Sequence, residues 1–389
     1  MRSNNEEEIS GNTPQISIVL PCLNEEQAIG FCLDQIKSVI KKNNLSAEIL
    51  VVDNGSADNS FKIAEEKQVR LVYEKEKGYG AACLKGLKAA EGKFIFLADC
   101  DGSYDFSEIL DFIEELKKGS DFVIGNRFKG RIENGAMPWP HQWIGNPILS
   151  GIFRLFFKAK IHDVHCGMKA LTQDALKMLN LRTKGMEFAS EIAMLVGKNR
   201  LKIKELPINY HKRRGRSKLR TLADGWRHLR FMLLYSPLFL FFIPGLILFL
   251  SGAASMLWMY LEPPKILGIQ FYYHPMFVSV LLIIIGYQLI IFSLFSKTYA
   301  ITYLGDKPVF EKLYKYITIE TASIAGILIG ISGMIIYAGI FFKWLSSGLG
   351  QLEEIRNSIL ALTLIIIGIQ TIFSSFMLSF LGIKGEPFE

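Results

Sequence analysis

The distribution of apolar residues divides the chain into two parts. Four long uncharged windows follow one another in the second part of the 389-residue sequence: Leu238–Tyr260, Pro275–Ser296, Thr321–Phe342 and Ile359–Phe380. Each is long enough to cross a bilayer core, which takes about 20 helical residues. In a soluble protein this pattern would need four consecutive helices that are apolar on every side. We therefore predict a membrane domain of four transmembrane helices over residues 238–383.

A different pattern precedes these windows. Short apolar runs of strand length occur at Ile16–Leu20, Ile49–Val52, Val69–Val72 and Phe94–Ala98. The segments between them have helical spacing: Glu26–Lys42, Ser60–Lys67 and Gly80–Ala90. This alternation predicts an α/β domain with a mostly parallel sheet and helices on both faces. We place that domain at residues 15–210 and expect residues 1–14 to be disordered.

Charge indicates how the chain is oriented. Residues 1–11 are polar, and Glu6, Glu7 and Glu8 stand where a signal peptide would have its apolar core. Residues 207–230 carry eight Lys or Arg and one acid, Asp224. By the positive-inside rule, the α/β domain and both termini are predicted to be cytosolic. Five cysteines without a CxxC pair fit reduced thiols and give no sign of zinc.

Polar residues gather where the predicted strands end. Asn24 and Glu25 follow the first strand, Asp53–Asp58 the second, and Asp99–Asp105 the fourth. Ligands of open parallel sheets bind beyond the carboxyl ends of the strands, so we expect one site there. Asp99 and Asp101 are suited to share a hard divalent cation that bridges phosphate oxygens. A solvated turn is the alternative for Asp-x-Asp taken alone.

Gly78-Tyr-Gly80 imitates the dinucleotide fingerprint but lacks its third glycine and follows the third strand. A nicotinamide enzyme is therefore not predicted, although a glycine turn could still bring the backbone close to a nucleotide. The basic run, with Gly215 and Ser217 inside it, favours a phosphate-binding loop. The alternative is a cationic flank that attracts anionic lipid headgroups. We expect residues 211–237 to form an acceptor loop and an interfacial helix whose aromatics lie within Trp226–Tyr235.

Taken together, these motifs resemble the family 2 glycosyltransferases of the polyprenyl-phosphate branch, the group of dolichyl-phosphate mannose synthases and their glucose-transferring relatives. The resemblance spans Ile16–Pro237. It rests on Pro21-Cys-Leu-Asn-Glu-Glu26, Val52-Asp-Asn-Gly-Ser56, Lys77-Gly-Tyr-Gly-Ala81, Asp99-Cys-Asp-Gly-Ser103, Gly125-Asn-Arg127, Asp163–Lys169 and Arg213–Leu219.

The resemblance implies a GT-A-type fold and a set of site residues. The nucleotide sugar would bind at Pro21, Leu23, Asn24, Glu25, Asp53, Asn54, Ser56, Lys77, Gly78, Asp99, Cys100 and Asp101. Mg²⁺ or Mn²⁺ would bind at Asp99, Asp101 and Ser103. Many relatives have Gln at the position of Ser103, so water or Asp105 is an alternative third ligand. The acceptor phosphate would bind at Arg127, Lys212, Arg213, Arg214, Ser217 and Lys218. Asp99, Asp101, Arg127 and Arg213 would be catalytic.

The function that follows is inverting transfer of one hexose, from GDP-mannose or UDP-glucose, to a polyprenyl or dolichyl phosphate at the cytosolic membrane face. We expect no nucleic-acid partner. The alternatives are a processive polysaccharide synthase and a non-catalytic flippase or scaffold for lipid-linked sugars. The synthase is disfavoured because only Gly225-Trp-Arg227 remains of its Gln-x-x-Arg-Trp motif.

Other residues leave their roles open. His162 and His165 flank Asp163 and suit either surface positions or a loop over the site, while Glu187 and Glu191 share a helical face that either meets the sugar or lies in solvent. In the spans, Ala322, Gly326 and Gly330 form a small-residue stripe, suited to close helix packing within one bundle or between protomers of a homo-oligomer.

Overall fold

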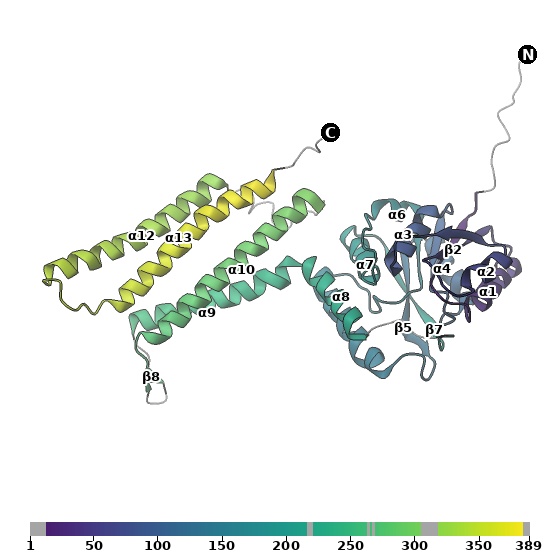
Figure 1. Cartoon of the computed structure of the whole chain (residues 1–389), viewed down its shortest axis with the longest axis horizontal. Helices are drawn as coiled ribbons and strands as arrows, with labels where there is room; N and C mark the ends of the chain where they lie inside the picture. The colour runs from purple at the N-terminus through teal and green to yellow at the C-terminus, as the bar shows by residue number, and fades with distance from the viewer. Residues whose placement is uncertain (1–12, 216–220, 263–264, 267–268, 305–317, 384–389) are drawn as a thin grey trace, which may run out of the picture. The chain divides into compact units, whose positions relative to one another are not determined.

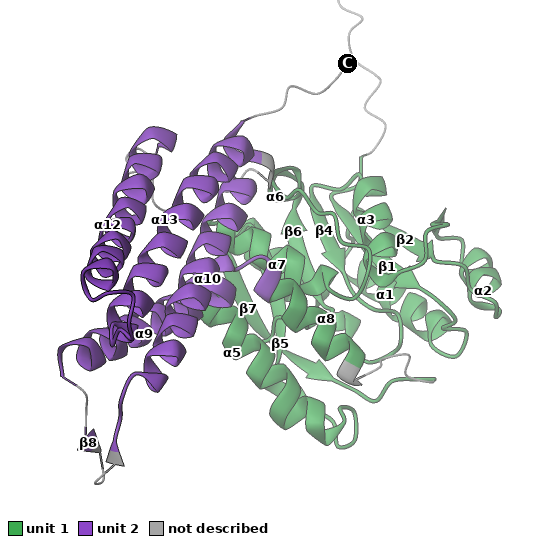
Figure 2. Ribbon diagram, turned by 60° about the vertical axis from the view of Figure 1, so that its left-hand side comes forward, with its two compact units in different colours: residues 1–232 green, residues 233–389 purple. Residues whose placement is uncertain are grey.

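A computed structural model describes residues 13–215, 221–262, 265–266, 269–304 and 318–383. The chain forms two compact units, Met1–Met232 and Leu233–Glu389 (Figure 2). The segment expected to be disordered, 1–14, lies almost wholly outside the described residues. Each unit is described by itself below.

The first unit is built on a sheet with the strand order β3-β2-β1-β4-β6-β5-β7 (Figure 1). Its strands are β1 (Ile16–Cys22), β2 (Ala47–Asp53), β3 (Arg70–Tyr73), β4 (Phe94–Leu97), β5 (Phe122–Ile132), β6 (Lys169–Thr172) and β7 (Ile203–Tyr210). β3, β2, β1 and β4 pair in parallel, as do β5 and β7, and β6 runs antiparallel to both β4 and β5. The predicted mostly parallel sheet is confirmed.

Helices cover both faces of this sheet. Val19 of β1 faces α3 (Tyr79–Ala89), where a Cβ added to Gly86 would lie 2.3 Å from its Cγ1 atom. Ile18, the next residue, pairs with Phe96 of β4, and the Phe96 ring meets Phe112 of α4 (Ile109–Lys117) at 5.4 Å. Because successive strand side chains point to opposite faces, α3 and α4 lie on opposite sides.

The remaining helical elements of this unit are α1 (Ile29–Lys42), α2 (Ser60–Glu66), η1 (Phe106–Glu108), η2 (His141–Gly145), α5 (Asn146–Phe157), α6 (Gln173–Met178), α7 (Phe188–Lys198) and α8 (Thr221–Leu234). All seven residues of β1 are buried, which is typical of a central strand covered on both faces. This burial holds the carboxyl ends of the strands, and the loops that follow them, in fixed positions.

The second unit contains the apolar helices. They are α9 (Ile243–Leu261), α10 (His274–Leu304), α12 (Ile319–Ser346) and α13 (Ile355–Gly382); η3 (Leu238–Phe242) leads into α9, and a hairpin of β8 (Lys265–Ile266) and β9 (Ile269–Gln270) precedes α10. The spans long and apolar enough to cross a membrane are Leu238–Leu261, His274–Thr302, Ile319–Ser346 and Ile355–Gly382. The four predicted transmembrane helices are thus confirmed by length and composition.

Glycines allow these helices to pack in close pairs. A Cβ on Gly368 of α13 would lie 2.6 Å from the carbonyl oxygen of Gly326 in α12. A Cβ on Gly286 of α10 would lie 2.3 Å from the backbone nitrogen of Phe249 in α9. Gly326, a member of the predicted small-residue stripe, therefore packs within the bundle.

Candidate active site

Loops after β1 and β2 are tied together at the carboxyl edge of the sheet. The backbone N–H of Asn24 donates to the Ser56 hydroxyl at 2.9 Å, and the N–H of Ala57 donates to Asn24 Oδ1 at 2.7 Å. Asn24 takes the left-handed conformation, with a φ of 49°, which Asn tolerates better than most residues. Three predicted site residues, Asn24, Glu25 and Ser56, are thus brought together, and Leu23 beside them is exposed.

Asp53 and Asn54 shape the second loop. The Asp53 carboxylate accepts hydrogen bonds from the N–H groups of Gly55 and Ser56 at 3.1 and 3.2 Å. The Asn54 amide donates to the carbonyls of Glu74 and Glu76 and accepts from the N–H of Gly78. Asn54 therefore connects the loops after β2 and β3 at the edge of the site.

Gly78 lies where two backbones approach closely. Its φ is 146°, and an added Cβ would lie 2.1 Å from the carbonyl oxygen of Lys184. Gly80 has the same contact with Thr183, at 2.4 Å. This packing against residues 183–185 explains the glycine pair without a ligand. Lys77, beside it, is exposed.

The acidic turn after β4 places Asp99 and Asp101 at this edge. Asp101 is 7% exposed, and its Oδ1 atom accepts from the Ser103 N–H at 3.0 Å and the Ser103 hydroxyl at 2.5 Å. Between the two acids, the Cys100 thiol points inward to the carbonyl oxygen of Pro21 at 3.3 Å. Asp105, the alternative third metal ligand, accepts from the N–H of Ser107 and caps η1.

Asp99 is held in a tight setting. A Cβ on Gly167 would lie 2.2 Å from Asp99 Oδ2, so only glycine leaves room for this carboxylate. Burial and the nearby Asp101 raise the pKa of Asp99 to about 6, while the Tyr79 hydroxyl lowers it. Two carboxylates close enough to oppose each other's ionisation form an arrangement that a divalent cation would stabilise.

The basic loop folds onto this acidic turn. Arg213 bridges the two acidic loops: its guanidinium pairs with Glu25, and its Nη1 atom lies 3.2 Å from Asp101 Oδ2. The Arg214 N–H donates to the Asp101 carbonyl, while its guanidinium stacks 3.6 Å above the Phe31 ring. Lys212 lies on the side of Glu133, whose carboxylate accepts its N–H. Of these three cations, Arg213 therefore reaches the carboxylates. Ser217 and Lys218 lie outside the described residues.

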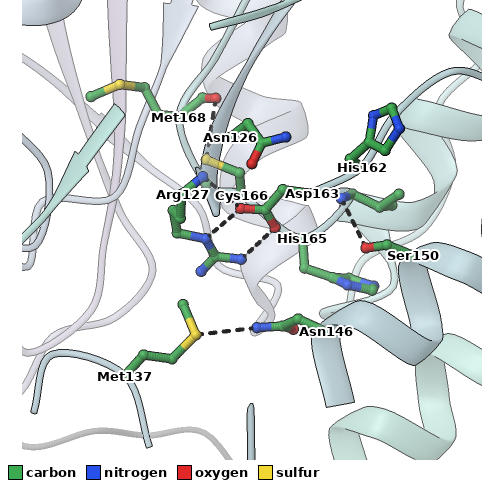
Figure 3. A network of polar contacts seen from close by, with 12 residues as sticks. Asn126, Arg127, Met137, Asn146, Ser150, His162, Asp163, His165, Cys166 and Met168 are labelled. Atoms are coloured by element: carbon green, nitrogen blue, oxygen red, sulfur yellow. Dashed lines mark hydrogen bonds and ion pairs between the residues drawn. The ribbon is translucent and has the colours of Figure 1, made fainter. Parts of the chain in front are cut away.

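A buried ion pair supports the site from β5 (Figure 3). Nε and Nη2 of Arg127 each donate to Asp163 at 2.7 Å, and Asp163 also accepts the Arg127 N–H. The guanidinium carbon lies 5.2 Å from the centre of the Tyr210 ring at the end of β7. Arg127 is 7% exposed, so the pair holds β5, β7 and the loop before β6 together.

The four residues whose roles the sequence left open, His162, His165, Glu187 and Glu191, lie in different surroundings. His162 is exposed and lies 2.8 Å from Glu205, as a surface position would suggest. Glu191 is buried and accepts the N–H groups of Arg182 and Thr183, so it is not on a solvated face. Glu187 lies beside Gly185, and His165 packs against His228 at 4.2 Å between ring centres.

Sequence reasoning missed several residues that hold these groups. In the sequence, Asp163 and Gly167 stand out only as parts of a motif, and Tyr79 only as part of a glycine turn. Lys169 is fully buried in β6, where its amine donates to the Cys166 carbonyl and burial lowers its pKa. Gly167 lies two residues before β6 begins, and no periodicity in the sequence places a loop glycine against a carboxylate.

The chemistry of this set suits a divalent cation with few protein ligands. In the described part of the chain, no group of three or more His, Cys, Asp or Glu residues has metal-binding geometry. Asp99 and Asp101 still supply the hard oxygen ligands that Mg²⁺ prefers, and Mg²⁺ commonly uses one or two carboxylates together with substrate phosphates. The residues present therefore fit a cation that is completed by its ligand.

Comparison with known proteins agrees with this geometry. Residues 17–179 match glycosyl transferase family 2, and residues 294–382 match the glycosyltransferase family 2 C-terminal transmembrane region. The low-salt glycan biosynthesis hexosyltransferase Agl6 of Haloferax volcanii is 34% identical over 374 residues, which cover 95% of this chain and 89% of that protein. The chain belongs to the family 2 glycosyltransferases, and its first unit has their GT-A-type fold.

Two shorter relatives match about half of the chain. A UDP-N-acetylglucosamine–dolichyl-phosphate N-acetylglucosaminyltransferase of Methanococcus voltae is 32% identical over 219 residues, 50% of this chain and 84% of that protein. A dolichyl-phosphate hexose transferase of Haloferax volcanii is 29% identical over 211 residues, 54% of this chain and 89% of that protein. The predicted membership of the polyprenyl-phosphate branch is thus confirmed.

Proposed function

We propose that this protein transfers a single hexose from a nucleotide sugar to a polyprenyl or dolichyl phosphate. The observation that carries the proposal is the contact of Arg213, from the basic loop, with Glu25 and Asp101 of the acidic loops. A site that joins a cation-binding acidic turn to a phosphate-binding basic loop suits two anionic substrates. Two relatives named as dolichyl-phosphate transferases support this class of acceptor.

The donor is assigned to the loops after β1, β2 and β4. Asn24, Asp53 and Ser56 form a hydrogen-bonded rim there, and Asp99 and Asp101 lie beside it at the same sheet edge. Asp99 and Asp101 would hold Mg²⁺ or Mn²⁺ on the diphosphate. The bound cation would neutralise the charge that develops on the leaving nucleoside diphosphate.

The acceptor needs little help to react. A phosphate monoester has a second pKa near 6, so it is already largely ionised at neutral pH. The protein therefore has to position the phosphate and offset its charge, which we assign to Arg213. Arg127 is assigned a supporting position behind this loop, since Asp163 engages its Nε and Nη2 atoms. Single displacement at the anomeric carbon would invert its configuration.

The proposed place of reaction is the cytosolic membrane face. The four apolar spans follow directly after α8, so the first unit is tethered to a bilayer. Residues 138–153 contain no Asp, Glu, Lys or Arg, yet Trp139, Trp143 and Ile148 there are exposed. Side chains of this kind sit at headgroup depth, which supports a catalytic unit that works against the membrane surface.

The test is transfer by the purified full chain. Radiolabelled UDP and GDP sugars are offered with undecaprenyl and dolichyl phosphate, with Mg²⁺, Mn²⁺ or a chelator. We expect one donor to give a metal-dependent glycolipid, with loss of at least about 10²-fold in Asp101→Asn. Asp111→Asn, at an exposed position of α4, is the matched control and should retain activity. Nucleotide binding without transfer from any donor would reject an enzymatic role.

A further inference from the structure

Three polar side chains meet inside the first unit, away from the acidic turn. The Ser190 hydroxyl lies 2.9 Å from Nδ1 of His228 and 3.4 Å from Nε2 of His165. The two imidazole rings pack edge to face, with 4.2 Å between their centres. Ser190 is fully buried and His228 is 7% exposed. A serine without access to solvent is no nucleophile, so this is not a hydrolytic triad.

The cluster connects three elements of the first unit: the loop before β6, α7 and α8. His165 belongs to the loop before β6, Ser190 to α7 and His228 to α8. The His165 loop also supplies Asp163, which engages Arg127 (Figure 3). It supplies Gly167 as well, which abuts Asp99. One short loop is therefore in contact with a candidate donor-side residue, a candidate acceptor-side residue and α8.

α8 is the first described element after the basic loop. Arg213 and Arg214 fix the beginning of that loop at Asp101. α8 begins at Thr221, six residues after Gly215, and is thus the next described element that follows the basic loop in the chain. His228 is buried on α8, whereas Trp226, Arg227 and Arg230 are exposed, so His228 is an anchor of this helix on the first unit.

Burial keeps both histidines of this anchor uncharged. It lowers the pKa of His228 to about 4 and that of His165 well below its usual value, so both rings are neutral at physiological pH. Nδ1 of His165 is buried without a hydrogen-bond partner among the described residues. The Ser190 hydroxyl is then the group that contacts one nitrogen of each ring, and its loss would leave buried nitrogens unpaired.

We infer that His165, Ser190 and His228 form a positioning cluster that holds α8, the helix that follows the basic loop in the chain, against the Asp163–Gly167 loop. The cluster thereby sets the affinity for the acceptor phosphate and not the affinity for the donor. This consequence for affinity rests on the proposed function, whereas the anchoring of α8 does not.

The first test compares two buried serines in the full chain. Ser190→Ala should raise amide hydrogen exchange in residues 221–234 and raise the acceptor KM about 3- to 10-fold, with the donor KM unchanged. Ser17→Ala is the matched control, because Ser17 is also fully buried and bridges two groups, Glu48 and the N–H of Gly92, in another part of the unit. It should change neither α8 exchange nor acceptor KM.

The second test examines the hydrogen bond between Ser190 and His228 itself. His228→Asn keeps a polar atom near the position of Nδ1 and should remain close to wild type, whereas His228→Phe keeps a ring and should match Ser190→Ala. Equal α8 exchange in Ser190→Ala and Ser17→Ala would overturn the anchoring. Parallel rises of donor and acceptor KM would overturn the effect on the acceptor. A chain that transfers no sugar would reject the proposed function, and the exchange result would still decide the anchoring.

Discussion

At the scale of single residues, the site depends on groups that surround the acidic turn. Asp99 can take its position because Gly167 leaves room for the carboxylate. The pKa of Asp99 is raised because the carboxylate is buried and because Asp101 is close. Arg213 offsets that negative charge from the other side. The carboxylates are therefore held by contacts with the loop before β6, with α3 and with the basic loop as much as by their own turn.

Gly167→Ala tests the space for Asp99. The new methyl group would lie 2.2 Å from Asp99 Oδ2 and 2.9 Å from the Tyr104 hydroxyl, so the carboxylate must move. A displacement of about 1 Å is enough to cost roughly 10²-fold in rate, and we expect kcat/KM to fall by that order. Gly30→Ala in α1, where the nearest atom is 3.4 Å away, should leave activity unchanged. Equal activity of the two variants would show that Asp99 is not confined.

Asp163→Asn tests the buried pair with Arg127. The substitution keeps the shape but leaves a guanidinium whose side chain is only 8% exposed without its counter-charge. Breaking a buried pair on one side costs about 3–5 kcal/mol, so the melting temperature should fall clearly. Glu114→Gln removes a partner from the exposed Lys118 pair and should leave the melting temperature unchanged. Similar melting of both variants would contradict a structural role for Asp163.

The sequence predicted the carboxylates at the site, because strand ends of a parallel sheet converge and Asp99 and Asp101 follow a strand. The family resemblance singled out Arg213 from its neighbours Lys212 and Arg214, and Arg213 does contact Asp101. The residue pattern alone gives no such choice, since a loop without periodicity gives no side-chain direction. Asn54 and Gly78 each hold two segments together, through contacts with residues that are far away in the sequence. Such contacts follow from packing and not from spacing.

At the scale of elements, His228 is expected to make the packing of α8 dependent on pH, because its buried ring is neutral. An unfolded histidine takes up a proton near pH 6.5, and His228 in the folded chain does so only near pH 4. Burial is the main cause, Lys169 acts in the same direction, and Asp224 and Glu187 oppose it; His165, also neutral, faces the ring.

Since the unfolded state gains its proton first, stability should fall as the pH drops from about 6.5 to about 4, by up to about 3 kcal/mol. His228→Phe removes this loss. Melting of the solubilised full chain at several pH values measures it: wild type should lose stability relative to the variant in this window. Parallel curves would show that His228 is not buried as a neutral ring.

The close helix pair α12–α13 can be tested by two substitutions. Gly368→Leu puts a side chain against the backbone of Gly326 and Gly330, and overpacking of this kind costs about 1–3 kcal/mol. Gln370→Leu breaks a 3.1 Å hydrogen bond with Gln288 of α10, a type worth only about 0.6 kcal/mol in membranes. Gly368→Leu should therefore lower the melting temperature of the solubilised chain more. The reverse order would contradict packing as the main force.

Secondary structure could be predicted where its pattern was strong. The four apolar spans and the strands β1–β4 have clear periods and were placed within a few residues. β5, β6 and β7, which form one side of the sheet, were not predicted. Their positions follow from pairing with β4 and with one another, which has no local signal.

At the scale of the whole molecule, the chain combines a GT-A-type unit with an apolar helical unit, and the basic loop precedes the helix that ends where the second unit begins. This order is suited to an enzyme whose donor is water-soluble and whose acceptor stays in a bilayer. We expect one sugar to be transferred per lipid phosphate, because the proposed acceptor is a phosphate and not the hydroxyl of a growing glycan.

The most direct measurement is the mass of the lipid product that the purified full chain makes from its preferred nucleotide sugar and polyprenyl phosphate. We expect the mass of the acceptor to increase by a single hexosyl group, in a product that forms only with a divalent cation and is lost in Asp101→Asn. A ladder of products with several sugars would indicate a polymer synthase. An unchanged lipid, in the presence of demonstrable nucleotide binding, would contradict transfer altogether.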